Sequence, residues 1–338
     1  MISQLRSILG KYGIPLLLFV ATVLTTTASG ARFMRNFLAG SPPIASDADL
    51  WPWGWLARHP GLFSTGLPFS ASLLAILLIH EFGHYFACRW HRIRTTLPWV
   101  LPAPTLSGTA GAVIQIRSRI PTRDALMDVG VYGPLAGYLA TLIALTFGFA
   151  LSYSPPASAP HALQALERHQ ALRSRQALVQ SEAPESIIQF GGEPVTLHLV
   201  HALVAHWNPA IPSFDRITPH PILLAGWIGL FITALNLIPG GQLDGGHILY
   251  AISPRLHRIS TRILPFALLL AGILYWAGWI LWGLILLLPA MRRPRPPIET
   301  TLSPARIVLG ITGLAIFLLT FTLTPFHGNS LLDFIHAF

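Results

Sequence analysis

Six apolar runs alternate with polar connections along the chain. They lie at about residues 13–29, 66–88, 128–152, 219–239, 260–290 and 305–325. An α-helix needs roughly 20 mainly apolar residues to cross the hydrocarbon core of a bilayer. The pattern therefore predicts an all-α polytopic membrane protein with about six apolar runs.

The fifth run, 260–290, is long for one crossing and short for two. Its middle, Tyr275–Trp279, reads YWAGW, and tyrosine and tryptophan prefer the membrane interface while glycine permits a turn. With the N-terminus inside, a hairpin here places 15 of the 22 Lys and Arg residues inside, whereas a single crossing places 11 on each side. Because inner loops carry excess positive charge, we expect a hairpin and six or seven membrane segments.

The connections divide the chain into three parts. We expect an N-terminal anchor and loop at 1–65, a core at 66–250 and C-terminal membrane segments at 251–338. The first run, Ile14–Ser29, fits a signal anchor better than a cleaved signal peptide, although it ends in TTTASGA.

One connection, 153–218, is both long and polar. Residues 161–180 have helical character, and 195–207 suit a helix lying in the membrane interface. We expect the histidines of that second segment to be solvated rather than to bind a metal; they are His198, His201 and His206.

Composition supports the membrane class. The chain is 52% hydrophobic and 10% charged, whereas a soluble domain carries charge on about a quarter of its residues. The net charge of +9 comes from basic residues between apolar runs, so we expect no nucleic-acid partner. One cysteine, Cys88, excludes an intramolecular disulfide.

The second run contains the motif His80-Glu81-Phe82-Gly83-His84. Residues four apart share one face of a helix, so both imidazoles can reach one metal ion, and Glu81 lies close enough to bind a water on that metal. The alternative is that the three polar residues pair with one another. Three such residues without a function would be costly inside a bilayer.

A catalytic zinc ion usually has three protein ligands. The segment 236–249, NLIPGGQLDGGHIL, offers Asp244 as its one carboxylate. The alternative is a helix-ending turn with Asp244 as the N-cap of the next helix. In the predicted topology, His80, His84 and Asp244 all lie toward the inner side of the membrane, as one shared site requires.

Together these residues resemble the site-2 protease family of intramembrane zinc metalloproteases. That family pairs H-E-x-x-H with N-x-x-P-x-x-x-L-D-G on a second helix, matched here by Asn236, Pro239, Leu243, Asp244 and Gly245. The resemblance covers about 66–250. It implies His80, His84 and Asp244 as Zn²⁺ ligands, Glu81 as general base, and Asn236 beside the site in contact with substrate. Residues 107–137 look similar to the PDZ-less branch of bacteria and plastids.

A short β-hairpin or re-entrant strand is expected after the second segment. The stretch 111–117, GAVIQIR, is β-branched and led by glycine. A protease that cuts a transmembrane helix must hold it extended, and a free strand edge can do so by β-augmentation. We therefore expect Gly111, Val113 and Gln115 to bind substrate, with a plain surface hairpin or linker as the alternative. Gly133–Gly137, GPLAG, suits helix packing.

These features predict a zinc metalloendopeptidase in the lipid bilayer that cleaves membrane-spanning or membrane-near proteins. The resemblance implies a bacterial inner membrane, with the site toward the cytoplasm; the oligomeric state is open. Two alternatives are an inactive membrane scaffold or chaperone and a divalent-metal transporter. The intact motif disfavours the first. The second lacks acidic residues, since Glu81 and Asp128 are the only ones inside the six runs.

Overall fold

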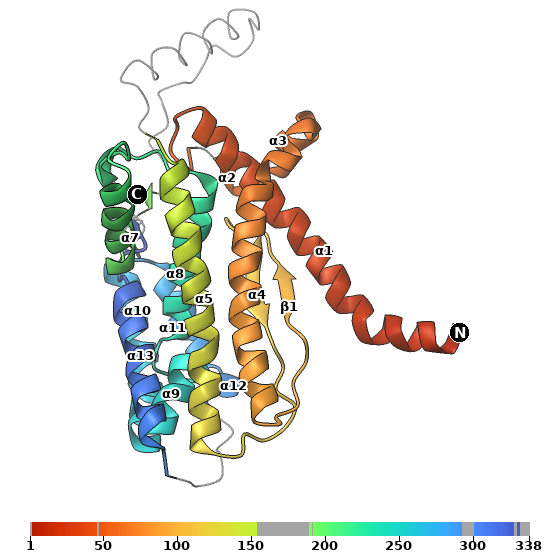
Figure 1. Ribbon diagram of the computed structural model, residues 1–338, viewed down its shortest axis with the longest axis vertical. Helices are drawn as coiled ribbons and strands as arrows, with labels where there is room; N and C mark the ends of the chain where they lie inside the picture. The colour runs from red at the N-terminus through yellow and green to blue at the C-terminus, as the bar shows by residue number, and fades with distance from the viewer. Residues whose placement is uncertain are drawn as a thin grey trace, which may run out of the picture.

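The computed structural model describes residues 2–45, 47–153, 189–190, 192–292, 301–327 and 330–331. This part of the chain is mostly helical, with two small antiparallel sheets of two strands each (Figure 1). By length and composition, four helical stretches could cross a membrane: Gly13–Leu38, Pro60–Trp90, Arg123–Leu151 and Pro254–Leu274. A mostly helical membrane protein is confirmed, whereas the number of six or seven segments is not.

The elements follow the apolar runs. The helices are α1 (Ile2–Leu38), α2 (Asp47–Leu50), α3 (Trp53–Arg58), α4 (Leu67–Trp90), α5 (Arg123–Leu151), α7 (Val195–Trp207), α8 (Pro221–Asn236), α9 (Asp244–Ile252), α10 (Pro254–Leu274), α11 (Gly278–Leu287), α12 (Pro289–Arg292) and α13 (Pro304–Thr320). The strands are β1 (Trp99–Pro102), β2 (Thr109–Val113), β3 (Gln189–Phe190) and β4 (Phe326–His327).

Helix α5 begins five residues before the apolar run that predicted it. The Thr122 hydroxyl accepts a hydrogen bond from the backbone N–H of Ala125 at 3.1 Å and so caps the first turn. That turn also contains Asp124, whose charge is favourable at a helix N-terminus. Hydropathy alone misses this polar first turn.

Helices α4, α5 and α8 form the centre of the bundle, and α5 contacts both of the others (Figure 1). Glycines bring the helices close together. A Cβ atom on Gly83 of α4 would collide with the Tyr132 backbone of α5, and one on Gly148 of α5 would collide with Leu223 of α8. Gly83 therefore lets the backbone of α5 approach α4 closely.

Strands β1 and β2 form an antiparallel hairpin that lies between α1 and α4 (Figure 1). Trp99 pairs with Val113 and Leu101 with Gly111. The predicted hairpin is confirmed, but its first strand lies outside 111–117, the stretch that predicts it, and ends at a proline. Pro102 ends β1 at a register shift, where proline is tolerated.

The fifth apolar run folds back on itself, as YWAGW predicted. Helix α10 ends at Leu274 and α11 begins at Gly278. A Cβ on Gly272 would meet Ile280, and one on Gly283 would meet Leu269, so the two helices run antiparallel. With 10 residues, α11 is too short to cross a bilayer alone.

The predicted interfacial helix is α7. Its Leu199 and Leu203 are exposed while Val200 is buried against the core. The His198 imidazole lies 2.7 Å from the Glu193 carboxylate, and the His201 Nε2 lies 2.9 Å from the carbonyl oxygen of Pro212. The helix predicted over 161–180 lies outside the described residues.

Candidate active site

A cavity of about 450 Å³ opens where α4, β2 and the turn between α8 and α9 meet. It brings together residues far apart in the sequence, and Glu81 and Asp244 both line it. The candidate histidines lie in the C-terminal half of α4, and Asp244 follows the C-terminal end of α8. Both motifs therefore lie toward the same end of the bundle.

Three ligand atoms converge on one point in this cavity. The Nε2 atoms of His80 and His84 are 3.1 Å apart. Oδ2 of Asp244 lies 3.4 Å from Nε2 of His80 and 3.2 Å from Nε2 of His84. Ligand atoms about 2.0–2.1 Å from a tetrahedral zinc ion are separated by roughly 3.3 Å, so this donor set has the size of a zinc site.

A backbone carbonyl orients one of the two imidazoles. Nδ1 of His84 lies 2.7 Å from the carbonyl oxygen of Val129 on α5, and it donates to that oxygen when it carries the proton. The Nε2 lone pair of His84 then faces His80 and the Asp244 carboxylate. Metal-binding histidines usually have this second hydrogen bond. A cation between the two Nε2 atoms and the carboxylate would accept a lone pair from each of them, so the residues fit a divalent metal.

Two glycines of α5 form the wall behind the histidines. A Cβ on Gly133 would occupy the space of the His84 imidazole, and a Cβ on Gly137 would lie 2.8 Å from Nδ1 of His80. The GPLAG stretch therefore packs α5 against α4, as predicted. Its packing partners are the candidate metal ligands themselves.

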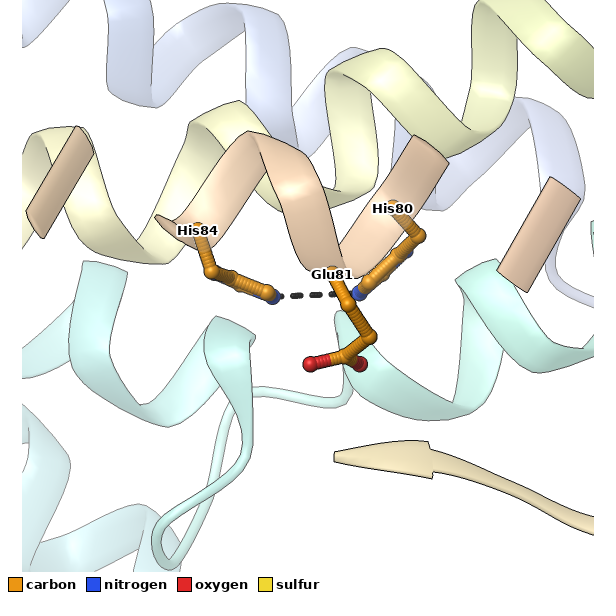
Figure 2. A group of neighbouring side chains, drawn as sticks. All are labelled: His80, Glu81 and His84. Carbon is orange, nitrogen blue, oxygen red and sulfur yellow. Dashed lines mark hydrogen bonds between the residues drawn. The ribbon is translucent and has the colours of Figure 1, made fainter. Parts of the chain in front are cut away.

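Glu81 is buried, 7% exposed, and lies on the same stretch of α4. A carboxylate oxygen of Glu81 and one nitrogen of each histidine all lie within 4.8 Å of one another. Figure 2 shows the histidine rings turned toward each other while Glu81 points toward the strand. Its carboxylate is therefore placed to contact a water beside the three-ligand set.

The turn after α8 positions Asp244, the third candidate ligand. Asn236 ends α8, and its Nδ2 lies 3.3 Å from Nε2 of His80. Gly241 has φ +60°, and a Cβ on Gly245 would collide with the carbonyl of Leu237. Asp244 is the first residue of α9 rather than its N-cap, which is Leu243. The alternative N-cap role is therefore wrong.

Buried Asp128 joins three elements next to the site. Its carboxylate lies 3.0 Å from Nη2 of Arg306 on α13 and 2.7 Å from Nε2 of His91 after α4. The neighbouring residue, Val129, supplies the carbonyl that contacts His84. These contacts tie α13, α5 and the end of α4 together around His84, a candidate metal ligand.

The expected substrate residues are only partly brought together. Val113 and Gln115 line the cavity, whereas Gly111 is not among the lining residues. Sequence reasoning missed Ala112 and His247, which also line it. His247 lies three residues after Asp244 on α9, so the helical period places both on neighbouring turns, and this spacing could have revealed it.

The sequence of the chain is similar to those of known proteins. The family model described as peptidase family M50 matches residues 68–278. The chain is 28% identical to the rice (Oryza sativa subsp. japonica) "Probable zinc metalloprotease EGY1, chloroplastic" over 94% of its own length and 51% of the relative. It is 24% identical to the Arabidopsis thaliana protein of that name, over 94% of the chain and 54% of the relative.

The chain thus spans about half the length of these relatives. Rice (subsp. indica) "Probable zinc metalloprotease EGY2, chloroplastic" is 29% identical over 77% of the chain and 43% of its own length. All three names place their proteins in the chloroplast. The expectation of a bacterial inner membrane finds no support in these relatives.

Proposed function

The chain belongs to peptidase family M50, the family of the site-2 proteases, and we propose that it is a zinc metalloendopeptidase acting on membrane-spanning or membrane-near proteins. One observation carries this proposal. The donor atoms of His80, His84 and Asp244 lie 3.1–3.4 Å apart, the spacing that zinc ligands have, beside the Glu81 carboxylate in a cavity against the C-terminal half of α4. The names of the relatives, as zinc metalloproteases, support the same metal and reaction.

Each residue of the site would have a different role in hydrolysis. When bound, Zn²⁺ would polarise the scissile carbonyl and make the attacking water more acidic. His80, His84 and Asp244 would hold the ion. Glu81 takes the proton of the water and passes it to the leaving amine nitrogen. Asn236, whose amide lies beside His80, would contact the substrate backbone.

The arginine-rich segments at this end of the bundle support an inner location for the site. Arg89, Arg92 and Arg94 lie at or just after the end of α4. By the positive-inside rule, this end of α4 faces the inner side of the membrane. We infer that the site opens toward that side.

Metal transport has less support. A transport path needs free acidic ligands across the membrane. Of the acidic residues in the apolar runs, Asp128 is bonded to Arg306 and His91, and Glu81 lies in the one His/Glu cluster found among the described residues.

The hairpin has one strand edge that can hold an extended substrate. The N–H of Thr96 donates to the carbonyl of Gln115 at 3.1 Å, so the backbone groups of Gln115 face the first strand, and those of Val113 and Gly111, two and four residues earlier, face it as well. Because the direction of backbone groups alternates along a strand, those of Ala112 and Ile114 face the opposite edge. Ala112, Ile114 and Glu81 all line the same cavity.

We therefore assign backbone contacts with substrate to Ala112 and Ile114. Val113 and Gln115, whose backbones pair with the first strand, would contribute side chains that line the cavity. A substrate strand added at this edge lies next to Glu81 and presents an extended peptide bond, as β-augmentation requires.

Ala112→Pro tests this edge. Proline removes the N–H on the free edge and is tolerated on edge strands. We expect kcat/KM for a single-span model protein to fall up to about tenfold, because the variant loses one hydrogen bond to the substrate. Ala112→Ser keeps the N–H and is the control. Equal activity of the proline and serine variants would contradict the assignment.

The proposed function itself is tested by zinc-dependent cleavage of a tagged single-span model protein by the purified chain in proteoliposomes. Cleavage that stops on chelation and returns with zinc supports it. Absence of cleavage with zinc bound favours the scaffold alternative.

A further inference from the structure

A polar run of α1 contacts the hairpin from the side opposite the cavity. The Thr25 hydroxyl donates to the carbonyl oxygen of Gly108, in the hairpin turn, at 2.6 Å. Its distances to carbonyl oxygens within α1 are longer, 3.1 Å. The Thr22 hydroxyl lies 3.3 Å from the carbonyl of Val100, with a shorter bond to its own helix. Thr25 is therefore the main link.

The backbones of α1 and the hairpin also touch directly. Gly108 has φ +79°, a conformation that favours glycine. A Cβ at Gly108 would lie 2.5 Å from the carbonyl oxygen of Thr25 and 2.7 Å from the nitrogen of Thr26. The hydrogen bond of Thr25 thus forms where the backbones of α1 and the hairpin are in direct contact, with no side chain between them.

The same run joins α1 to α4. The hydroxyls of Thr26 and Ser70 lie 2.6 Å apart, and both residues are buried. Ser70 lies on the helix that holds His80 and Glu81. Helix α1 therefore connects the hairpin and the catalytic helix through neighbouring residues, Thr25 and Thr26.

This arrangement leaves one edge of the hairpin open. A two-stranded hairpin is marginally stable alone, and unpaired backbone groups are costly inside a membrane. Helix α1 covers the outer edge, where the carbonyl of Val100 faces Thr22. The inner edge, at Ala112 and Ile114, remains available on the cavity side.

We propose that Thr25, bonded to Gly108, is a positioning residue that holds the hairpin so that its inner edge lies beside Glu81. The proposal rests on the proposed function, since this edge is where the substrate would be extended. It assigns to the threonine run of α1 a role in substrate binding rather than in chemistry. Loss of the link therefore affects KM more than kcat.

Thr25→Val tests the proposal because valine keeps the shape and removes the hydroxyl. Thr27→Val is the matched control, since the buried hydroxyl of Thr27 has no hydrogen-bond partner among the described residues. Thr25→Ser should restore the link. We expect faster hydrogen–deuterium exchange over residues 99–113 in Thr25→Val alone. KM for the tagged single-span model protein should rise about three- to tenfold, the range for one hydrogen bond in a membrane protein.

The outcomes separate the two proposals. If Thr25→Val and Thr27→Val exchange alike, or if exchange rises while KM stays unchanged, the positioning role is wrong. If the wild type fails to cleave although zinc is bound, the proposed function fails. The role of Thr25 in substrate binding is then wrong as well. The exchange data still decide whether Thr25 holds the hairpin.

Discussion

Replacing Glu81 with glutamine should lower cleavage by roughly two to four orders of magnitude, the usual contribution of a general base. Glutamine has nearly the same shape, but its amide cannot accept the proton of the attacking water. Glu81 lies outside the three-atom set formed by His80, His84 and Asp244, so the variant should still bind zinc. Cleavage rate and bound zinc are measured on the same purified sample.

Glu193→Gln is the control for this substitution. Glu193 is half exposed and pairs with His198, away from the residues that line the cavity. It should cleave like the wild type. Undiminished cleavage by Glu81→Gln would show that another group acts as the base. Loss of zinc from Glu81→Gln would instead make Glu81 a ligand.

Gly133→Ala should lower zinc affinity by about 100-fold, the upper range for disturbing the support of a ligand. The added methyl group would occupy the space of the His84 imidazole. Because the backbone of α5 packs closely on α4, the ring must move and lose its contact with Val129. Zinc affinity is measured by competition with a chromophoric chelator, and helicity by circular dichroism.

Gly54→Ala makes the same substitution where a Cβ meets nothing within 4 Å. It should bind zinc like the wild type. Gly137→Ala, which crowds His80 less severely, should give a smaller loss. Wild-type affinity in Gly133→Ala would mean that His84 is not held in the orientation described here.

The candidate metal site could be predicted because its chemistry is concentrated in two short motifs. The i, i+4 spacing of His80 and His84 requires one helix face, and charge counting placed Asp244 at the same membrane depth. The structure brings the three residues together. Pairing two motifs 160 residues apart rested on the predicted topology and on the resemblance, since no local rule connects them.

Other features depend on tertiary contacts that leave a weak local signal. The role of Gly133 is visible only when α4 and α5 are packed together. The first strand of the hairpin lies among prolines, which local propensity disfavours in strands. The backbone groups of Ala112 and Ile114 lie at the free edge because of the register in which the two strands pair. A shift of that register by one residue would turn the backbone groups of their neighbours toward the cavity instead.

The lengths of the helices also could not be predicted from the local hydropathy pattern. The apolar run at 219–239 has the length of a full span, yet α8 covers 16 residues because it ends at the turn that places Asp244. The threonines near the end of the first run read as part of a signal-anchor terminus. In the structure they bond to the hairpin and to α4.

The most direct test of the central claim is zinc-dependent cleavage by the wild-type chain. Purified protein in proteoliposomes is stripped of metal, loaded with increasing zinc and mixed with a tagged single-span model protein, and the new termini are located by mass spectrometry. We predict that cleavage rises with bound zinc, saturates at one ion per chain, and cuts a bond at or near the membrane-spanning segment. Full cleavage by the metal-free chain, or none by the zinc-loaded chain, would contradict the account.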